Sequence, residues 1–318
     1  MNRIVLRSLS PARAVLPAAV FLAFLGAAST PAVAGPFSHM FAKSAAHKTV
    51  DAGDKAALVG AAVRQALDEK RYVDAADLFE KAQIAKISSP HLVDLDGELL
   101  LARGQYSDAL MMFRGASADP AEKAEALEGE GLALSMLGKS DEALADLKQA
   151  TALDKSLWRA WNGLGREYDI RHDWKLSEAA YKEGLACAGA ETAIILNNRG
   201  YSHMLQHQPE LAKTDFVAAL DKDPALAAAR TNLRIAMAMD GHYDRAAVVG
   251  VGDDKAAVLN NVGLAAAIRG DYPEAEKLLN QAIQAKGAYY ERAADNLQLA
   301  KQLEARSVEH QALPNVTP

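Results

Sequence analysis

Apolar residues recur at spacings of three and four along most of the chain, in short runs that are separated by turn residues. In the stretch 260–285, Gly270 can end one helix in a left-handed conformation, and Asp271 and Pro273 suit the start of the next. Apolar residues occupy one helical face on each side of that turn: Val262, Leu264, Ala266 and Ile268 before it, and Ala275, Leu278, Leu279, Ala282 and Ile283 after it. The pattern predicts a pair of short helices, which needs neighbouring pairs to bury its apolar faces.

The same unit occurs seven times along the chain. In each copy a turn residue is followed after two residues by an aromatic residue or its substitute, and three residues later by a small residue. The turn residues stand at intervals of 34, 34, 34, 35, 34 and 29 residues: Lys70, Gly104, Gly138, His172, His207, Gly241 and Gly270. A period of 34 residues in helical pairs is that of the tetratricopeptide repeat (TPR).

Further positions in phase with the turns strengthen this resemblance. Glycine recurs in the first helices, and a large residue recurs in the second helices: Gly97, Gly131, Gly165, Gly200 and Gly263, with Phe79, Phe113, Leu147, Tyr181, Phe216 and Leu279. A glycine inside a helix costs about 1 kcal/mol, so these positions predict helices that approach closely. The resemblance to the TPR family implies an all-α fold, a right-handed α-solenoid of about seven TPR helix pairs with a C-terminal capping helix.

The sixth copy departs from the pattern. After Ala246 and Ala247 it continues VVGVGDD, which is five residues short and rich in glycine. We expect its second helix to be truncated and fewer apolar contacts to hold its neighbours. Amide exchange should therefore be faster there than in the fourth and fifth repeats.

The two ends of the chain predict segments outside the array. Residues 1–34 carry three arginines without an acid, an apolar run, and Ala32-Val33-Ala34, which together predict a signal peptide cleaved before Gly35. The apolar run of about 15 residues is shorter than the roughly 20 that a membrane span needs. No cysteine follows the run, so there is no lipobox, and we expect an exported, periplasmic protein. The predicted domains are 1–34 signal peptide, 35–55 flexible leader, 56–289 TPR array, 290–306 capping helix and 307–318 disordered tail.

Composition and motifs argue against several classes of function. The formal net charge is −6 without any basic block, which does not favour nucleic acid or anionic lipid as a partner. Cys187 is the single cysteine, so an internal disulfide is excluded. His203 and His207 stand four residues apart, but no third ligand has a matching spacing. We therefore predict no enzyme activity, no metal site and no cofactor.

In the TPR family the first helices line a concave groove, chiefly through their second, fifth, sixth, ninth, twelfth and thirteenth positions. Counting from Trp158, Ala193, Ala227 and Ala256 predicts a peptide-binding groove in the fourth to seventh repeats. Its residues are Asn162, Arg166, Asn197, Asn198, Tyr201, Met204, Leu205, Asn232, Ile235, Met239, Asn260, Asn261, Leu264 and Ile268. Asparagine amides suit an extended peptide backbone, because each can both donate and accept hydrogen bonds. The alternative is that asparagine recurs in these helices for structural reasons.

The same count in the first three repeats predicts an acidic surface. It includes His91, Asp94, Glu98, Glu125 and Glu128. The predicted groove is therefore acidic at its N-terminal end, and amide-bearing and apolar at its C-terminal end.

A second resemblance narrows the expected function. Residues 193–303, from NNRGYSHMLQHQPELAKTDFVAAL to the helix with Ala293-Ala294-Asp295-Asn296-Leu297, look like TadD, the TPR component of tight-adherence (Flp) pilus assembly. That resemblance implies a non-catalytic periplasmic adaptor that binds a peptide or helical segment of a partner, for instance a secretin or a pilus-assembly component. The alternative is an exported TPR scaffold of another cell-envelope or polysaccharide assembly system.

Overall fold

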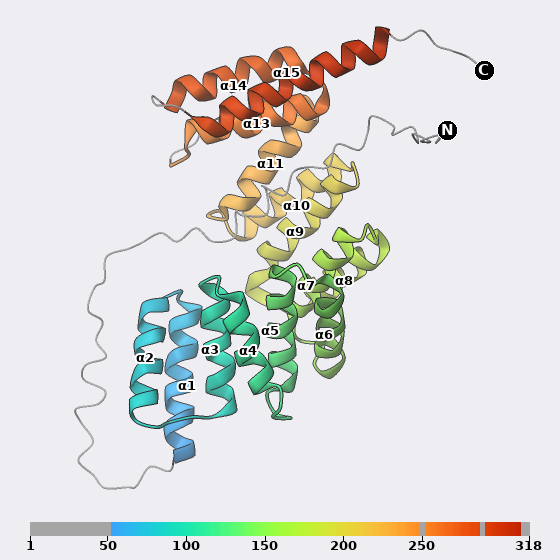
Figure 1. Cartoon of the computed structure of the whole chain (residues 1–318). Coiled ribbons are helices and arrows are strands. Elements are labelled where there is room, and N and C mark those ends of the chain that lie inside the picture. The colour runs from blue at the N-terminus through green and yellow to red at the C-terminus, as the bar shows by residue number, and fades with distance from the viewer. Residues whose placement is uncertain (1–51, 249–251, 287–289, 313–318) are drawn as a thin grey trace, which may run out of the picture. The chain divides into compact units, whose positions relative to one another are not determined.

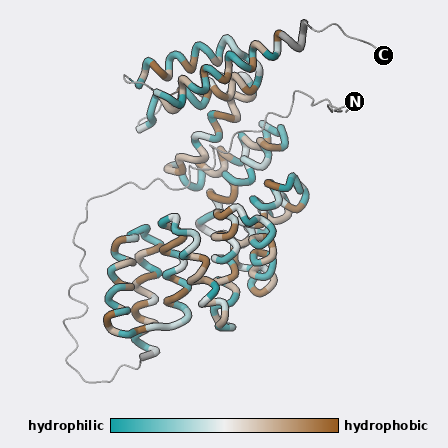
Figure 2. Tube along the Cα trace, viewed as in Figure 1, coloured by the Kyte–Doolittle hydropathy of each residue, from teal (hydrophilic) through white to brown (hydrophobic). Residues whose placement is uncertain are grey.

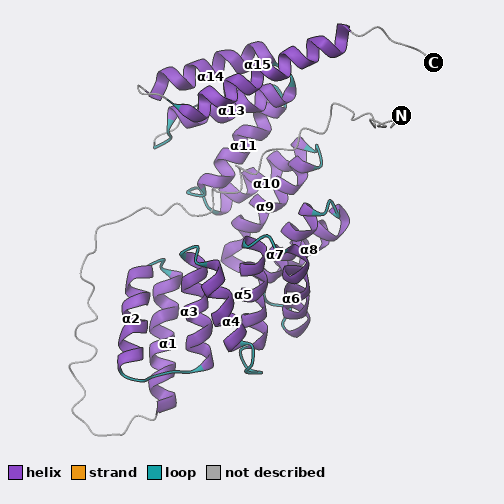
Figure 3. Cartoon of the chain, in the orientation of Figure 1, coloured by secondary structure: helices purple, strands orange, loops and turns teal. Residues whose placement is uncertain are grey.

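The computed structural model describes residues 52–248, 252–286 and 290–312, and the predicted signal peptide lies outside this part of the chain. The described residues form fifteen α-helices and one 3-10 turn, η3, with no strand among them (Figure 3). The helices are α1 Ala52–Asp68, α2 Tyr72–Ile84, α3 Pro90–Ala102, α4 Tyr106–Ala116, α5 Lys123–Met136, α6 Ser140–Leu153, α7 Trp158–Ile170, α8 Trp174–Cys187, α9 Thr192–Leu205, α10 Pro209–Lys222, α11 Ala227–Met239, α12 Tyr243–Ala246, α13 Lys255–Arg269, α14 Tyr272–Lys286 and α15 Glu291–Ala312. The predicted all-α array of about seven helix pairs followed by one more helix is confirmed.

The described residues divide into two compact units, 52–202 and 203–312, with the boundary inside α9. In the first unit each helix packs against its hairpin partner, and α1, α3, α5 and α7 also pack in series (Figure 1). In the second unit α13 packs against α11, α14 and α15. Hydrophobic and hydrophilic residues alternate along the helices of each unit, as expected for helices with one buried face (Figure 2).

The seven predicted turn residues all adopt a left-handed conformation. Their φ values are 57° at Lys70, 76° at Gly104, 75° at Gly138, 59° at His172, 58° at His207, 85° at Gly241 and 92° at Gly270. The N–H of the following residue then donates to a carbonyl five residues back, for example Arg71 to Ala66 at 2.7 Å. This is the Schellman arrangement that satisfies the last carbonyls of a helix. The repeat phase read from the sequence is therefore correct.

The glycines of the first helices accommodate the large residues of the second helices. A Cβ atom on Gly131 would lie 2.5 Å from Leu147 Cγ, and one on Gly263 would lie 2.8 Å from Leu279 Cγ. Gly97 with Phe113 and Gly165 with Tyr181 show the same relation. The predicted close approach is confirmed at these four pairs, and it explains why glycine occupies helix interiors.

The sixth pair has the predicted short second helix, because α12 contains only four residues. Charged contacts supplement the apolar ones here: Asp253 accepts from Arg234 at 2.5 Å and lies 3.5 Å from Arg230, both on α11. Asp254 caps α13 by accepting from the Ala256 N–H at 2.9 Å. Asp253 thus links the start of α13 to α11, and Asp254 stabilises that start, where a full second helix is missing.

The last helix is longer than the sequence indicated. α15 continues to Ala312, whereas we expected the capping helix to end at Arg306 and a disordered tail to follow. The stretch SVEHQA contains no glycine or proline, and the first helix breaker is Pro314. At the other end, α1 begins at Ala52, ahead of the expected array start at Ala56.

Candidate functional site

The predicted asparagines on α7 and α9 are buried and bonded to one another. Asn198 Nδ2 donates to Asn162 Oδ1 at 2.9 Å, and Asn197 Nδ2 donates to Asn198 Oδ1 at 3.2 Å. All three side chains are at most 8% exposed. These amides therefore join one first helix to the next within the unit 52–202.

The asparagines of the unit 203–312 show a parallel arrangement. Asn296 Nδ2, on α15, donates to Asn260 Oδ1 at 2.8 Å, and Asn260 Nδ2 donates to Asn261 Oδ1 at 3.2 Å. Asn260 is 1% exposed, Asn232 is also buried, and Asn261 is half-buried. α15 supplies the asparagine that a further first helix would have supplied. Part of the hydrogen-bonding capacity of these amides is thus used inside the protein.

The remaining predicted site residues are mostly half-buried. In the unit 52–202 these are Arg166 and Tyr201; burial, assisted by Asp169, raises the pKa of the Tyr201 hydroxyl. In the unit 203–312, Met204 and Met239 pack against a core that contains Ile235. Leu205, Leu264 and Ile268 are half-buried.

A buried carboxylate on α7 organises a polar network that sequence reasoning missed. Asp169 accepts hydrogen bonds from Ser177 at 2.5 Å, Ser202 at 2.6 Å and Tyr181 at 2.8 Å. Burial, followed by the charge of Asp169, raises the pKa of Tyr181 well above its usual value. Three hydroxyl donors bond to the carboxylate, so the network joins α7, α8 and α9.

Charged side chains gather on α1, α3, α5 and α7 in the unit 52–202. We call this set the acidic cluster; it consists of Arg64, His91, Asp94, Glu98, Glu122, Glu125, Glu128 and Arg159. Arg64 binds Glu98 through two hydrogen bonds, of 2.7 and 3.0 Å. Arg159 lies 3.7 Å from Glu98 and 3.9 Å from Glu128, and Glu128 also accepts from the Ala160 N–H at 2.8 Å.

The other acidic side chains of the cluster have no arginine or lysine in ion-pair contact among the residues that the structure describes. Glu122, the residue at the N-cap of α5, faces His91 at 3.0 Å. The Oδ1 atom of Asp94 is buried without a hydrogen-bond partner among the described residues, and the residue is 1% exposed. Gly60 on α1 leaves room for His91, because a Cβ there would lie 3.1 Å from the ring.

The pKa values of the cluster follow from these contacts. Burial, followed by the charges of Glu98 and Glu122, raises the pKa of Asp94 to about 7. Burial also raises the pKa of Glu128 and of Glu125. At Glu98 burial acts in the same direction, but Arg159 and Arg64 outweigh it and lower the pKa. Negative charge is thus stabilised at Glu98 and disfavoured at Asp94.

Sequence reasoning found five members of this cluster and missed three. Counted from Ala56 and Trp158, Arg64 and Arg159 stand at the ninth and second positions, which are among the positions counted for the groove. Their signal was therefore present and was not used. Glu122 precedes its helix, so the position count could not include it.

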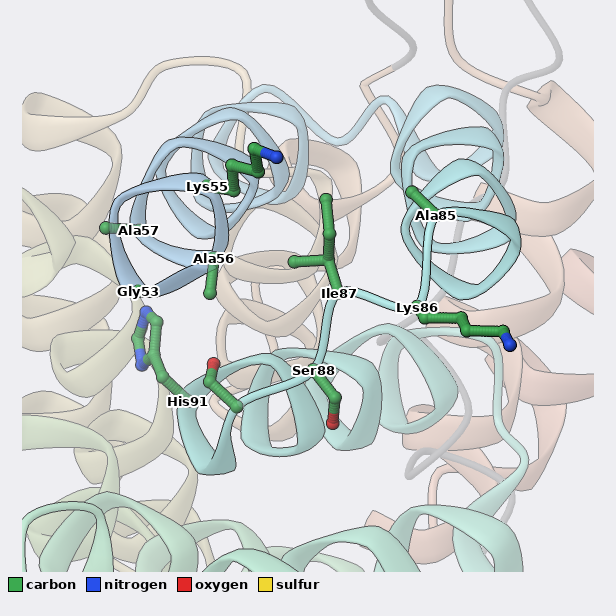
Figure 4. Close-up of a pocket in the computed structure, with 10 residues that line it drawn as sticks. Gly53, Lys55, Ala56, Ala57, Ala85, Lys86, Ile87, Ser88 and His91 are labelled. Atoms are coloured by element: carbon green, nitrogen blue, oxygen red, sulfur yellow. The ribbon is translucent and has the colours of Figure 1, made fainter. Parts of the chain in front are cut away.

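One open depression of about 500 Å³ lies between the start of α1 and the α2–α3 connection. Figure 4 shows its labelled side chains, with Lys55 and Lys86 directed apart and His91 at the side facing α1. Its polar groups do not converge on one point, so we assign it no ligand.

The described residues contain no group of three or more His, Cys, Asp or Glu side chains placed to hold a metal ion. His203 Nδ1 lies 3.1 Å from Asp215 Oδ2, and His207 is one of the left-handed turn residues. Among the helices in the described ranges, none has the length and apolar character required to cross a membrane.

The fold is similar to that of several solved structures. A thermophilic TPR protein of Thermus thermophilus superposes with a TM-score of 0.51 at 19% identity, over 57% of this chain and 98% of that one. The chain has the TPR fold.

Two further TPR-like matches are of similar quality. A chain of the Cut9–Hcn1 hetero-tetramer of the APC/C gives a TM-score of 0.55 at 18% identity, over 76% of this chain. The chain spans about half of that one, since the match covers 48% of it. PilF of Pseudomonas aeruginosa gives a TM-score of 0.50 at 17% identity, over 67% of this chain and 96% of that one. No protein-family model and no curated protein sequence matches the chain.

Proposed function

We propose that this TPR protein is a non-catalytic adaptor that binds a peptide or helical segment of a partner protein on its first helices. The observation that supports it most is a row of apolar residues in the unit 203–312. Leu205, Met239 and Ile268 lie on α9, α11 and α13. Each is thirteenth in the repeat count that starts at Ala193, Ala227 and Ala256, and each is half-buried. Repeat proteins use such in-phase surfaces to bind extended partners.

The contact residues of this proposal are those predicted from the sequence, taken unit by unit. In the unit 203–312, Asn261 and Leu264 stand at other groove positions of the repeat count, the sixth and the ninth from Ala256. Met239 of the apolar row has a flexible side chain that can adapt to different apolar partners. In the unit 52–202, Arg166 and Tyr201 are half-buried and follow the bonded Asn162 and Asn198 by four and three residues in the chain. The half-buried members are the direct contacts of the segment, and the buried asparagines hold the helices that present them.

The proposal extends to the location and the system of the protein. The N-terminal pattern favours export to the periplasm with cleavage near Ala34-Gly35 and no lipid anchor. The resemblance of residues 193–303 to TadD favours a role in Flp pilus or secretin assembly. A scaffold role in another cell-envelope or polysaccharide assembly system is the alternative. Affinity capture from periplasmic and outer-membrane fractions, with identification of the bound protein, separates these two roles.

The apolar row provides the sharpest test of the binding surface. Leu205→Glu should weaken binding of the captured partner by about 10- to 100-fold, which corresponds to about 1.4 kcal/mol per decade. The matched control is Leu211→Glu on α10, because Leu211 is also apolar and is 51% exposed on a second helix. The control should bind the partner normally. Affinity is measured by calorimetry, with the melting temperature of each variant recorded in parallel.

Alanine at Asn198, Asn232 and Asn261 tests the amides. We expect the triple variant to bind at least about tenfold more weakly. Its melting temperature should also be lower, since each hydrogen bond of these amides contributes about 1 kcal/mol to stability. Loss of binding in proportion to unfolded protein alone would assign these asparagines a purely structural role.

Equal binding by the Leu205 and Leu211 variants would refute the proposed surface.

A further inference from the structure

The acidic cluster of the unit 52–202 contains more negative groups than its own cations neutralise. It holds two guanidinium groups and a histidine against carboxylates on α3, on α5 and at the N-cap of α5. These carboxylates are Asp94, Glu98, Glu122, Glu125 and Glu128. Arg64 binds Glu98, and Arg159 lies near Glu98 and Glu128. Asp94, Glu122 and Glu125 therefore have no arginine or lysine in ion-pair contact within the described residues.

Within the cluster, Asp94 has a side-chain oxygen whose hydrogen-bonding capacity is not satisfied. Its Oδ1 atom is buried and lacks a hydrogen-bond partner among the described residues. An unsatisfied buried polar group costs about 1–3 kcal/mol, and a charged one costs more. Glu98, Glu122 and Glu125 repel its ionised form, and Arg64 attracts it. An additional cation near these carboxylates would remove most of that cost.

We propose that the acidic cluster binds a lysine- or arginine-containing segment of a partner protein. Glu125, which is exposed, and Glu122 contact the cationic side chain, while the more deeply buried Asp94 contributes negative charge to the site. The inference rests on the proposed adaptor function, but it uses a surface other than the apolar row of the unit 203–312, so the two surfaces are tested separately.

A basic side chain fits this cluster better than a metal ion does. Metal ions need several ligands that converge on one point, and no such group occurs in the described part of the chain. The carboxylates are instead distributed over two helices and a helix end. The bidentate contact of Arg64 with Glu98 already shows how a guanidinium group is held in this cluster.

Binding is measured with the purified full chain by fluorescence anisotropy, at an ionic strength of about 0.1 M. The probe is a short labelled alanine peptide that carries two lysines and two arginines, with the ends blocked. Its counterpart has glutamine at the four basic positions. We expect saturable binding of the basic peptide and none of the glutamine peptide. Displacement of the basic peptide by millimolar Ca²⁺ or Mg²⁺ would indicate a metal site and would overturn the proposal.

A matched pair of double variants separates a site from general electrostatic attraction. Glu122→Gln with Glu125→Gln removes two negative charges from the cluster. Asp141→Asn with Glu142→Gln removes two from α6, where both side chains are exposed. The cluster variant should bind about tenfold more weakly, or about 1.4 kcal/mol, and the control should change less than about twofold. Equal losses would overturn the site, and circular dichroism melting confirms that each variant is folded.

The pH dependence tests the part assigned to Asp94. The charged groups around it are Arg64 on α1, His91 and Glu98 on α3, Glu122 and the two acids of α5, and Arg159 on α7. A cation favours the ionised carboxylate, so affinity should rise several-fold between about pH 6 and about pH 8. In Asp94→Asn the rise should be smaller, because the carboxyl group that gains charge in that range is absent from the variant. If the affinity of the variant rises as much as that of the wild type, Asp94 does not contribute to the site.

Discussion

Asp94 on α3, in the unit 52–202, and Asn260 on α13, in the unit 203–312, are both fifth in the repeat count, which starts at Pro90 and Ala256. Both are 1% exposed, and their side chains have nearly the same shape. Asn260 accepts from Asn296 and donates to Asn261, whereas Asp94 Oδ1 has no hydrogen-bond partner among the described residues. At equivalent buried positions, one polar side chain is therefore hydrogen-bonded and the other has a buried oxygen without a partner, which lowers stability.

The difference extends to the surrounding side chains. In the same count, the ninth positions on α1 and α3 carry Arg64 and Glu98, and those on α11 and α13 carry Ile235 and Leu264. Around Asp94 charges are held by ion pairs and remain partly unbalanced, while around Asn260 neutral amides bond to one another beside apolar side chains. The repeat backbone thus fixes where a polar group is buried, and the neighbouring repeats determine whether it is satisfied.

The largest effect is expected when Asp94 is made to resemble Asn260. The pKa of Asp94 is raised to about 7 in the folded protein, against 3.8 for the ordinary carboxyl. The folded state therefore binds the proton more tightly, and stability falls as pH rises from about 4 to about 7. Asp94→Asn removes this loss, so its free energy of unfolding should exceed that of the wild type by up to about 4 kcal/mol at about pH 8.

Urea unfolding of both proteins at about pH 4 and about pH 8 measures this effect. The two proteins should be close in stability at the lower pH. If their stabilities run parallel across the whole range, Asp94 does not carry an unbalanced charge.

The reverse exchange, Asn260→Asp, should lower stability by about 2 kcal/mol at neutral pH, because it buries a charge. It removes the N–H group that donates to Asn261 and places a carboxylate oxygen next to that acceptor. The bond from Asn296 remains available and limits the loss. The melting temperature of the variant should fall between about pH 5 and about pH 8, while Asn260→Ala should show a loss that does not depend on pH.

The smallest effect concerns the packing that both units share. Gly131→Ala and Gly263→Ala should each destabilise the protein by about 1–2 kcal/mol, because the new methyl group meets a leucine in a filled core. The loss should be larger at Gly131, where the Cβ would lie 2.5 Å from Leu147, than at Gly263, where it would lie 2.8 Å from Leu279. Thermal unfolding of both variants provides the comparison, and Gly138→Ala serves as a control for backbone strain alone, since nothing lies near that position.

Much of the fold could be predicted because its signals are local. Gly270 ends α13 and Asp271 follows it, so the turn depends on adjacent residues only. The short α12 was predictable because VVGVGDD cannot continue a helix with an apolar face. The end of α15 was missed, since a polar stretch without glycine or proline is compatible with helix and with disorder alike.

The candidate sites were predictable only in part. Position counting placed Asp94, Glu98 and Glu128 on one face, and the structure brings them together with Arg64 and Arg159. The binding role of the asparagines and of the apolar row remains a prediction, because the structure contains no partner.

The sequence by itself determined the repeat, the turn positions, the glycine–large residue pairs and the faces on which charges and amides lie. These properties depend on the spacing of residues within one helix pair. Only the tertiary structure decided which polar side chains meet, such as Asn198 with Asn162, and which remain without a partner, such as Asp94. The reason is geometric: partners from adjacent repeats lie more than thirty residues apart in the chain, for example 36 for Asn198 and Asn162. Their contact depends on how one first helix is rotated against the next, which the spacing of residues does not encode.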